Sequence, residues 1–463
     1  MSEVKRMTIL SPQGMLGYSY PLDSLKNGLS YNPDVIAVDA GSTDGGPHRL
    51  GLGIGGVSRY ATKKDLIPLV IAAKKRQIPL IIGSSGGSGR NSRVDWLKEI
   101  IDEIAAEEQF SLDVACIYSD IEKNWLKEKL KENKVVPCGP VQSLTTDIID
   151  DSIVIVAQMG VEPIIEALKT KPDIIIAGRA YDPVLFAALP IMKGFDPGLA
   201  LHLGKVLECG AIAASPGTAK DGMIGILYED HFLVTPTNKK RACTPQSVAA
   251  HTLYEKSHPY YLPGPGGMLD LSKTSFIKED EHTVCIRGSR FVPSEQYTVK
   301  AEGVKATGYR TVFIAGARDP LFIAQYDAII EETKREIKQY FPAVKEQKAT
   351  LFIKTYGLDG VLGSREFDRT VSKEIGIVAE VTAETQELAD SIMAYFRSVL
   401  MHFDYPNRIS TSGNLALPFS PPEFSGGKTF EFSIYHLITL DEKETMFPIF
   451  FERIGIDEKT EIE

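Results

Sequence analysis

Short apolar runs alternate with amphipathic segments through the first half of this chain. Runs of strand length, rich in β-branched residues, lie at residues 34–41, 78–87, 113–119, 152–160 and 172–183. Continuous apolar runs of this kind are typical of strands that are covered on both faces. Their alternation with helices predicts an α/β fold with a mostly parallel, doubly wound sheet and helices on both sides.

The segment 94–108 is one of the helices expected between these strands. Leu97, Ile100, Ile101 and Ile104 recur at the i, i+3, i+4, i+7 spacing that places side chains on one helix face. We therefore expect this apolar stripe to pack against the sheet.

The pattern changes near residue 240. From there the chain alternates β-like and helical segments in the order strand, helix, strand, strand, helix, strand over about 345–440. This spacing predicts a smaller α+β domain in the ferredoxin-like style. We expect an α/β domain with Gly-rich strand-end loops at 1–240 and an α+β domain at 241–463.

Charge and hydropathy exclude some functions. The net charge of −10 over 463 residues argues against a nucleic-acid partner, which needs a concentrated basic face. No apolar run is long enough to span a membrane, and the first residues lack the features of a signal peptide. The five scattered cysteines are typical of a reducing compartment. These features predict a cytoplasmic protein.

The loop after the strand at 34–41 carries several polar groups of different chemistry. Asp39 and Asp44 are candidate ligands of Mg²⁺ or another divalent cation, while Asp44 and His48 are candidate catalytic acid–base groups. The alternative is that Asp39 caps a helix and the glycines only permit the turn.

A Gly/Ser-rich loop follows the next strand. Small residues let backbone amides approach an anion, and an arginine adds a charge-assisted fork. Neither the dinucleotide motif nor the P-loop is present, so a nucleotide is not specifically indicated. The alternative is a tight turn with serine caps. The candidate substrate-binding residues of this loop are Ser84, Ser85, Gly86, Gly87 and Arg90.

Arg179, Tyr181 and Asp182 directly follow the apolar strand at 172–183. Arg179 either receives a substrate carboxylate or pairs with Asp182, Tyr181 is a candidate substrate contact, and Asp182 a candidate catalytic group. In doubly wound sheets, loops after the strands meet at one edge. We therefore expect Asp44, Ser85 and Arg179 to converge on one polar hollow.

One helical turn brings Lys205 beside Glu208 and Cys209. Such a trio can lower the pKa of a thiol, although a buried structural cysteine is the commoner outcome.

Several long phrases resemble one known family. "GSSGGSGRN", "GRAYDP", "EGVKATGYRTVFIAGARDP" and "ISTSGNLALPFSPPEFSGGKTFEFSIYHLI" together resemble the acyclic terpene utilisation (AtuA-like) family over roughly residues 30–440. The resemblance implies a component of bacterial operons that degrade branched or unusual carboxylic acids, often beside a small partner subunit. It supplies no catalytic residues.

These observations favour a lyase of the hydro-lyase type, acting on a short-chain or branched carboxylic acid or its CoA thioester. In this hypothesis, arginines bind the substrate carboxylate and an acid–base pair moves the protons. Removal of the α-proton forms an aci-carboxylate, which hydrogen-bond donors of the Gly/Ser-rich loop stabilise. The alternative is a non-catalytic ligand-binding or scaffold subunit of an acid-degrading complex. A nucleotide-using ligase is weakened by the missing P-loop. We expect a homo-oligomer.

Overall fold

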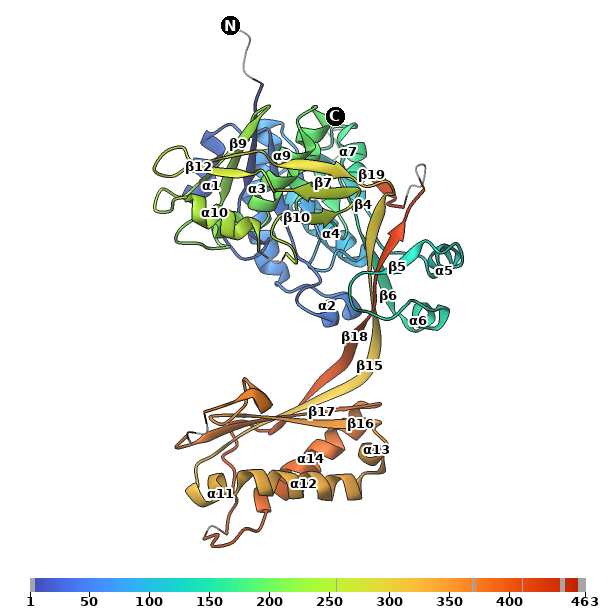
Figure 1. The fold of residues 1–463 in the computed structure, drawn as a ribbon, viewed down its shortest axis with the longest axis vertical. Coiled ribbons are helices and arrows are strands. Elements are labelled where there is room, and N and C mark those ends of the chain that lie inside the picture. Colours follow the sequence, from blue (N-terminus) through green and yellow to red (C-terminus); the bar gives the residue numbers. More distant parts are fainter. Residues whose placement is uncertain are drawn as a thin grey trace, which may run out of the picture. The chain divides into compact units, whose positions relative to one another are not determined.

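The computed structural model describes residues 5–254, 256–368, 370, 372–409, 411–441 and 446–456. The chain forms two compact units, shown as a ribbon in Figure 1. Unit 1 comprises Met1–Lys305 and Phe432–Glu463, and unit 2 comprises Ala306–Glu431.

A ten-stranded mixed sheet runs through unit 1, which gives it a mixed α/β fold. The central strands, in the order β1-β2-β3-β7-β4, are parallel, whereas the flanking strands on both sides are antiparallel. In spatial order the strands are β12 (Ser275–Lys278), β13 (Val284–Arg287), β9 (His231–Pro236), β8 (Met223–Leu227), β1 (Met7–Ser11), β2 (Val35–Asp39), β3 (Leu80–Gly83), β7 (Ile174–Ala177), β4 (Ser111–Ile117) and β19 (Ile449–Gly455).

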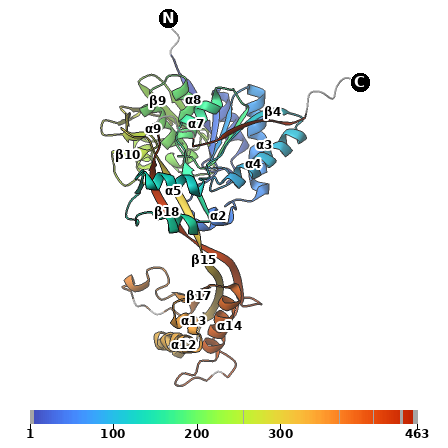
Figure 2. The same ribbon diagram turned by 90° about the vertical axis from the view of Figure 1, so that its right-hand side faces the viewer.

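Alternate residues of the central strands enter two different cores. In β2, Val35 and Ala37 belong to one core, and Ile36 and Val38 belong to the core on the opposite face. Figure 2 shows helices on both sides of these strands. The first core includes α7 (Glu162–Leu168), α8 (Val184–Met192) and α9 (Pro197–Leu207), and the second includes α3 (Arg59–Arg76) and α4 (Asn91–Glu107).

The apolar stripe predicted on α4 is confirmed. Its four members, Leu97, Ile100, Ile101 and Ile104, are fully buried in the second core. The helical spacing therefore identified the buried face correctly, because only that face of α4 meets the sheet.

The sheet differs from the predicted mostly parallel sheet in its flanks. Strands β8 and β9 are joined by a short connection, which permits antiparallel pairing only. Strand β13 continues the same sheet beside β9, and β19 pairs antiparallel with β4. The boundary predicted at residue 240 thus falls inside unit 1. It follows β9, which pairs with β8 before the boundary and with β13 after it.

The apolar run at 152–160 forms β6 (Val154–Gln158), which lies outside the ten-stranded sheet. Strand β6 pairs antiparallel with the first part of β15 (Thr298–Ala317), in a register that sets Gln158 opposite Lys300. In the same unit, β5 (Val135–Pro137) pairs with the last part of β18 (Glu423–Thr439). A separate small sheet contains β10 (Tyr261–Gly264), β11 (Gly267–Asp270) and β14 (Arg290–Pro293).

Unit 2 has its own core. Its sheet has the strand order β16 (Ala349–Tyr356), β17 (Ile375–Ala383), β15 and β18. The chain order of its main elements is β-α-β-β-α-β. The helices α12 (Tyr326–Tyr340) and α14 (Gln386–His402) lie along one side of this sheet (Figure 1), where Phe313 and Phe396 are fully buried. The unit begins within β15, upstream of the predicted start near 345. Its further elements are α11 (Pro320–Ala324), α12 (Tyr326–Tyr340), α13 (Pro342–Lys345), β16 (Ala349–Tyr356), β17 (Ile375–Ala383) and α14 (Gln386–His402).

The remaining helices of unit 1 are short: α1 (Leu22–Ser30), α2 (Pro47–Leu52), α5 (Lys123–Lys131), α6 (Thr146–Asp151) and α10 (Pro245–Thr252). Within the described ranges, no helix combines the length and the apolar character needed to cross a membrane.

Candidate active site

Three loops of unit 1 follow neighbouring parallel strands and meet at one edge of the sheet. Strands β2, β3 and β7 end at Asp39, Gly83 and Ala177. The Ala40 amide donates to the Gly83 carbonyl at 2.9 Å, and the Ser84 amide donates to a carbonyl of the loop after β7 at 3.0 Å. The parallel register therefore brings together loops that are far apart in the sequence.

A cavity of about 550 Å³ opens beside these loops, and all of its lining residues belong to unit 1. Of the predicted site residues, Asp44, Arg179, Tyr181 and Asp182 line it. The cavity is strongly charged and rich in tyrosine: its lining includes the cations Arg179, Lys205, Lys256 and Lys300, the carboxyl groups Asp44, Asp182 and Glu208, and the phenols Tyr181, Tyr261 and Tyr435.

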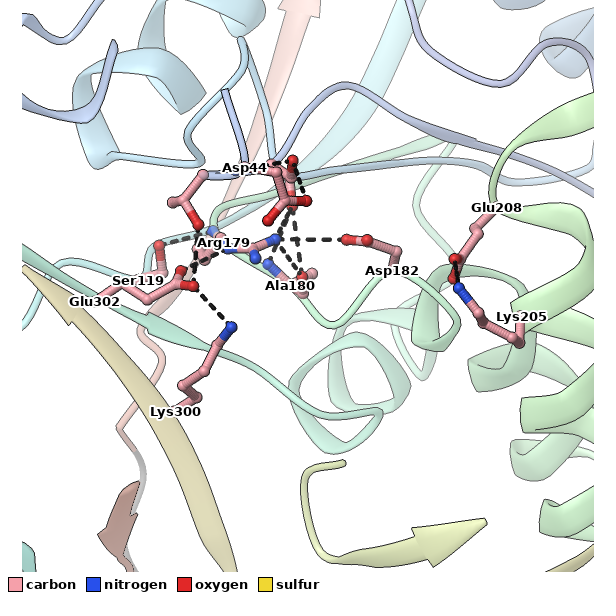
Figure 3. Close-up of polar contacts among 12 residues, drawn as sticks. Asp44, Ser119, Arg179, Ala180, Asp182, Lys205, Glu208, Lys300 and Glu302 are labelled. Atoms are coloured by element: carbon pink, nitrogen blue, oxygen red, sulfur yellow. Dashed lines mark hydrogen bonds and ion pairs between the residues drawn. The ribbon is translucent and has the colours of Figure 1, made fainter. Parts of the chain in front are cut away.

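One end of the cavity is organised by the buried carboxylate of Glu302, which is 1% exposed. Arg179 donates from Nε to Glu302 Oε2 at 2.9 Å, and Lys300 Nζ lies 2.8 Å from Oε1 (Figure 3). Thr43 donates its hydroxyl to the same Oε1 at 3.0 Å. Because Lys300 and Glu302 are two residues apart on β15, their side chains lie on one face of that strand.

The charges at this end of the cavity stabilise one another. Burial alone raises the pKa of Glu302, but Arg179 and Lys300 outweigh burial and bring it down to about 2. The pKa of Arg179, which burial lowers, is raised instead, chiefly by Glu302 and then by Asp182. Glu302 is therefore ionised, and it fixes two cations at the cavity wall.

Asp182 lies further into the cavity, on the loop after β7. Its side chain is 27% exposed, and Arg179 donates to it from Nη1 at 3.4 Å. Burial raises the pKa of Asp182, and Asp44 raises it further, against the opposing effect of Arg179 and Lys205. Asp182 thus keeps its proton at a higher pH than an ordinary aspartic acid does.

Lys205 and Glu208 form a buried ion pair at the other end of the cavity. Lys205 lies in the last turn of α9, and Glu208 directly follows the helix. Burial raises the pKa of Glu208 to about 7, although the adjacent Lys205 opposes the rise. The neighbouring Cys209 shows no sign of thiol activation, because burial raises its pKa as well.

Lys256 and Tyr181 complete this end. Lys256 Nζ lies 3.4 Å from the Tyr181 hydroxyl and 5.2 Å from the centre of its ring. The hairpin that starts at β10 forms the adjoining wall, where a Cβ on Gly264 would lie 2.8 Å from the Tyr181 ring. Close approach of this hairpin therefore requires glycine at that position.

The Gly/Ser loop lies behind the cavity and is absent from its lining. Ser84 and Ser85 are fully buried, and the Ser85 amide and hydroxyl both donate to the Ala177 carbonyl, at 3.1 and 2.7 Å. Arg179 donates from Nη1 to the Ser84 hydroxyl at 3.2 Å. Of the three residues expected to converge, Asp44 and Arg179 share the cavity, whereas Ser85 packs beneath it.

The other predicted residues of these loops are also outside the lining. Gly86 and Gly87 have positive φ values of 61° and 112°, and a Cβ on Gly86 would lie 2.7 Å from the Arg93 guanidinium. Arg90 is directed to the Leu50 carbonyl, at 3.4 Å. His48 is an exposed residue of α2.

Asp39 is buried beside the cavity, and its Oδ1 has no hydrogen-bond partner. Burial, followed by the charge of Asp182, raises the pKa of Asp39 well above its usual range. A carboxyl group that retains its proton is a poor metal ligand, since ligands bind in their deprotonated form. Among the residues that the structure describes, no group of three or more His, Cys, Asp or Glu side chains could hold a metal ion. The Asp39–Asp44 cation site stays a prediction.

Sequence reasoning missed Lys256, Lys300 and Glu302. Lys300 and Glu302 reach the site only because β15 pairs with β6, a contact between distant segments. One feature of the sequence could have pointed to Glu302, because it is a lone acidic residue within a β-like stretch. A carboxylate that is buried in such a strand needs a cationic partner. The sequence analysis considered Glu208 only for its effect on the thiol of Cys209. It did not predict Glu208 as a residue of the cavity.

The fold and the site define a mixed α/β protein with a charged cavity at the carboxyl edge of its parallel strands. The family model of acyclic terpene utilisation family protein AtuA matches residues 61–408. The chain therefore belongs to the acyclic terpene utilisation family, as its longer phrases predict. Neither the curated proteins nor the solved structures gave a match.

Proposed function

We propose that this protein is a hydro-lyase that acts on a short-chain or branched carboxylic acid or its CoA thioester. One observation carries the proposal: two carboxyl groups with raised pKa values, Asp182 and Glu208, line the same cavity as four cationic side chains. Carboxyl groups tuned toward neutral pH serve as general acids and bases, and cations bind a carboxylate and stabilise the charge that develops on it.

Glu208 is the general base in this proposal. With a pKa of about 7 and Lys205 at bonding distance, it is substantially ionised at neutral pH. Its carboxylate removes the proton from the carbon next to the substrate carboxylate. The electron pair of that C–H bond forms the carbon–carbon double bond as the neighbouring C–O bond breaks.

Asp182 is the general acid. Its raised pKa lets it hold a proton until the hydroxyl leaves, and the transfer of that proton releases water. Asp44 has a supporting part in this step, because its negative charge contributes to the raised pKa of Asp182. Lys205 and Lys256, which lie at the same end of the cavity as Glu208, are placed to bind the substrate carboxylate, so that the neighbouring carbon lies beside the base.

The test is deuterium incorporation next to the carboxylate of short-chain 3-hydroxy acids and 2-enoic acids in D₂O, followed by NMR. The wild type incorporates deuterium, and Glu208→Gln slows incorporation roughly 100- to 10,000-fold, as expected when a general base is lost. The rate falls as the pH drops through about 7, because the base becomes protonated. Adding Mg²⁺ or a chelator tests a metal requirement in the same assay.

Glu166→Gln is the matched control. Glu166 pairs with Lys169 at the same i,i+3 spacing as the Lys205–Glu208 pair, but on the surface, with both side chains 60% exposed. The Glu166→Gln substitution leaves the rate of deuterium incorporation unchanged. If the wild type exchanges no deuterium, or if Glu208→Gln exchanges at the wild-type rate, the lyase proposal fails. The chain is then better described as a non-catalytic ligand-binding or scaffold subunit.

The small partner subunit and the homo-oligomer stay predictions.

A further inference from the structure

The guanidinium of Arg179 is held in place through two of its three nitrogens. Nε donates to Glu302 at 2.9 Å, and Nη1 donates to the Ser84 hydroxyl at 3.2 Å and to the Ala180 carbonyl at 3.0 Å. Nη1 also lies 3.4 Å from Oδ1 of Asp182. These partners belong to β15 and to the loops after β3 and β7, and together they fix the plane of the side chain before any ligand enters.

The third nitrogen, Nη2, makes no hydrogen bond to any residue that the structure describes. It is not sealed among protein atoms either, and Arg179 lines the cavity. Because Nε and Nη1 are occupied by protein acceptors, Nη2 is the nitrogen through which Arg179 can donate to a ligand.

The charge of Arg179 is already accompanied by negative partners. Arg179 forms an ion pair with the buried Glu302, and Asp182 lies beside it (Figure 3). Lys300 shares Glu302, and Asp44 lines the same cavity. A carboxylate at Nη2 would add negative charge beside Glu302 and Asp44, whereas a hydroxyl oxygen accepts a hydrogen bond without adding charge. Nη2 is therefore suited to a neutral oxygen.

Asp182 is adjacent to this donor and reaches the same cavity. Its side chain is 27% exposed, and it is the general acid of the proposed function. Because Nη1 and Nη2 belong to one planar group, a single ligand oxygen can accept from Nη2 and contact the Asp182 carboxyl. The two residues thus form a site for one hydroxyl group.

We propose that Arg179 is a further catalytic residue, whose Nη2 donates to the hydroxyl oxygen of a 3-hydroxy acid while Asp182 protonates that oxygen. This inference rests on the proposed function. As the C–O bond breaks, its electron pair passes to the oxygen, and the proton of Asp182 completes a water molecule. Arg179 keeps its protons and stabilises the negative charge that develops on the oxygen during the step.

Interconversion of 2-butenoate and 3-hydroxybutyrate, followed by NMR, tests the catalytic role. Arg179→Lys keeps the positive charge beside Glu302 but lacks a second terminal nitrogen. The variant interconverts the two acids roughly 100- to 1,000-fold more slowly than the wild type, as expected when one preorganised donor is lost. Arg310→Lys is the matched control and leaves the rate unchanged, because Arg310 donates from Nε to Glu380 at 2.8 Å within unit 2.

Calorimetric titration separates a contact with the hydroxyl from a purely structural role. In a Glu208→Gln background, which prevents turnover, 3-hydroxybutyrate binds about tenfold or more tightly than butyrate, because only the hydroxy acid accepts from Nη2. Adding Arg179→Lys removes this preference and leaves the affinity for butyrate within about twofold. A structural role alone would weaken the binding of both acids alike.

Thermal unfolding reports whether Arg179→Lys folds. If it does not, the comparison of the two acids in the Glu208→Gln background decides the question, because Arg179 is intact there. Equal affinities for 3-hydroxybutyrate and butyrate overturn the inference, as does a folded Arg179→Lys variant that works at the wild-type rate.

Failure of the proposed function gives a different result. A wild type that exchanges no deuterium refutes the lyase proposal and, with it, the catalytic role of Arg179. A wild type that exchanges deuterium, together with equal affinities or an unaffected Arg179→Lys variant, refutes this inference alone.

Discussion

The Glu302 carboxylate holds more of the site in place than any predicted residue does. It accepts from Arg179, Lys300 and Thr43 while almost completely buried. Removing one member of a buried ion-pair network leaves the other charges uncompensated, and such changes cost about 3–5 kcal/mol. We expect Glu302→Gln to lose this much free energy of unfolding in urea denaturation. The surface variant Glu166→Gln stays within about 0.5 kcal/mol of the wild type.

The pH dependence of that loss has a defined sign. The pKa of Glu302 falls from its ordinary 4.5 to about 2 on folding, so its ionised form stabilises the native state above the ordinary value. The stability gap between wild type and Glu302→Gln is therefore constant at neutral pH and shrinks as the pH falls from about 4.5 toward 2. A gap that is independent of pH, or one below about 1 kcal/mol, contradicts the assigned role.

At the scale of elements, the loop after β3 depends on glycine where it crosses the loop after β7. Gly89 has a φ of +70°, and a Cβ there would lie 2.2 Å from the Arg179 amide nitrogen. We predict that Gly89→Ala loses roughly 2–4 kcal/mol, from backbone strain together with overpacking. Thermal or chemical unfolding measures the loss.

Gly139→Ala is the control for backbone conformation alone. Gly139 also has a positive φ, +91°, but an added Cβ would meet no atom within 4 Å. Its cost is limited to the left-handed conformation, about 1–2 kcal/mol. If the two variants are equally stable, the crossing at Gly89 does not constrain the site.

The strands that build the site could be predicted because a strand that is buried on both faces needs a continuous apolar sequence, which can be recognised without knowing its neighbours. The runs that became β2, β3 and β7 are free of charged residues apart from Asp39 at the end of β2, and the α4 stripe is equally local. The run of β6 has the same character but pairs with β15, since an apolar run indicates burial and not the partner strand. Lys300 and Glu302 were missed for that reason.

The glycine-rich loop shows the limit of composition as a guide. Small residues at residues 83–90 fit an anion cradle and a tightly packed turn equally well. In the structure this loop is a tightly packed turn, in which Ser85 donates to the Ala177 carbonyl and Ser84 accepts from Arg179. Whether such a loop binds an anion or forms a packed turn depends on the segments that contact it. One of these is the loop after β7, which is distant in the sequence.

At the scale of the whole molecule, the cavity lies in unit 1, and unit 2 has a separate core. All lining residues are in unit 1, while Phe396 is fully buried in the core of unit 2, with its ring 6.0 Å from that of Phe313. We predict that Phe396→Ala destabilises unit 2 by about 3–5 kcal/mol and leaves carboxylate binding within twofold of the wild type. Calorimetric unfolding and titration at a temperature where the variant is folded measure both effects. A variant that is folded but does not bind would show that the site needs an intact unit 2.

The division of the chain was the hardest feature to predict. Unit 1 takes up the chain again at Phe432, after unit 2, and β19 near the end pairs with β4. The antiparallel part of the sheet begins with β8 and β9, before the change of sequence pattern near residue 240, and continues with β13 after it. A boundary between units requires long-range pairing information, which a local pattern does not contain.

The central claim is that ligand chemistry takes place in the cavity between Glu302 and Glu208. The most direct measurement is a crystal structure of the Glu208→Gln variant of this chain with a short-chain 3-hydroxy acid that the wild type exchanges. We predict the acid in this cavity, with its carboxylate at Lys205 and Lys256 and its hydroxyl beside Asp182. An acid found instead in a different cavity, such as the one of about 620 Å³ whose lining includes Lys74 and Lys193, would contradict the account.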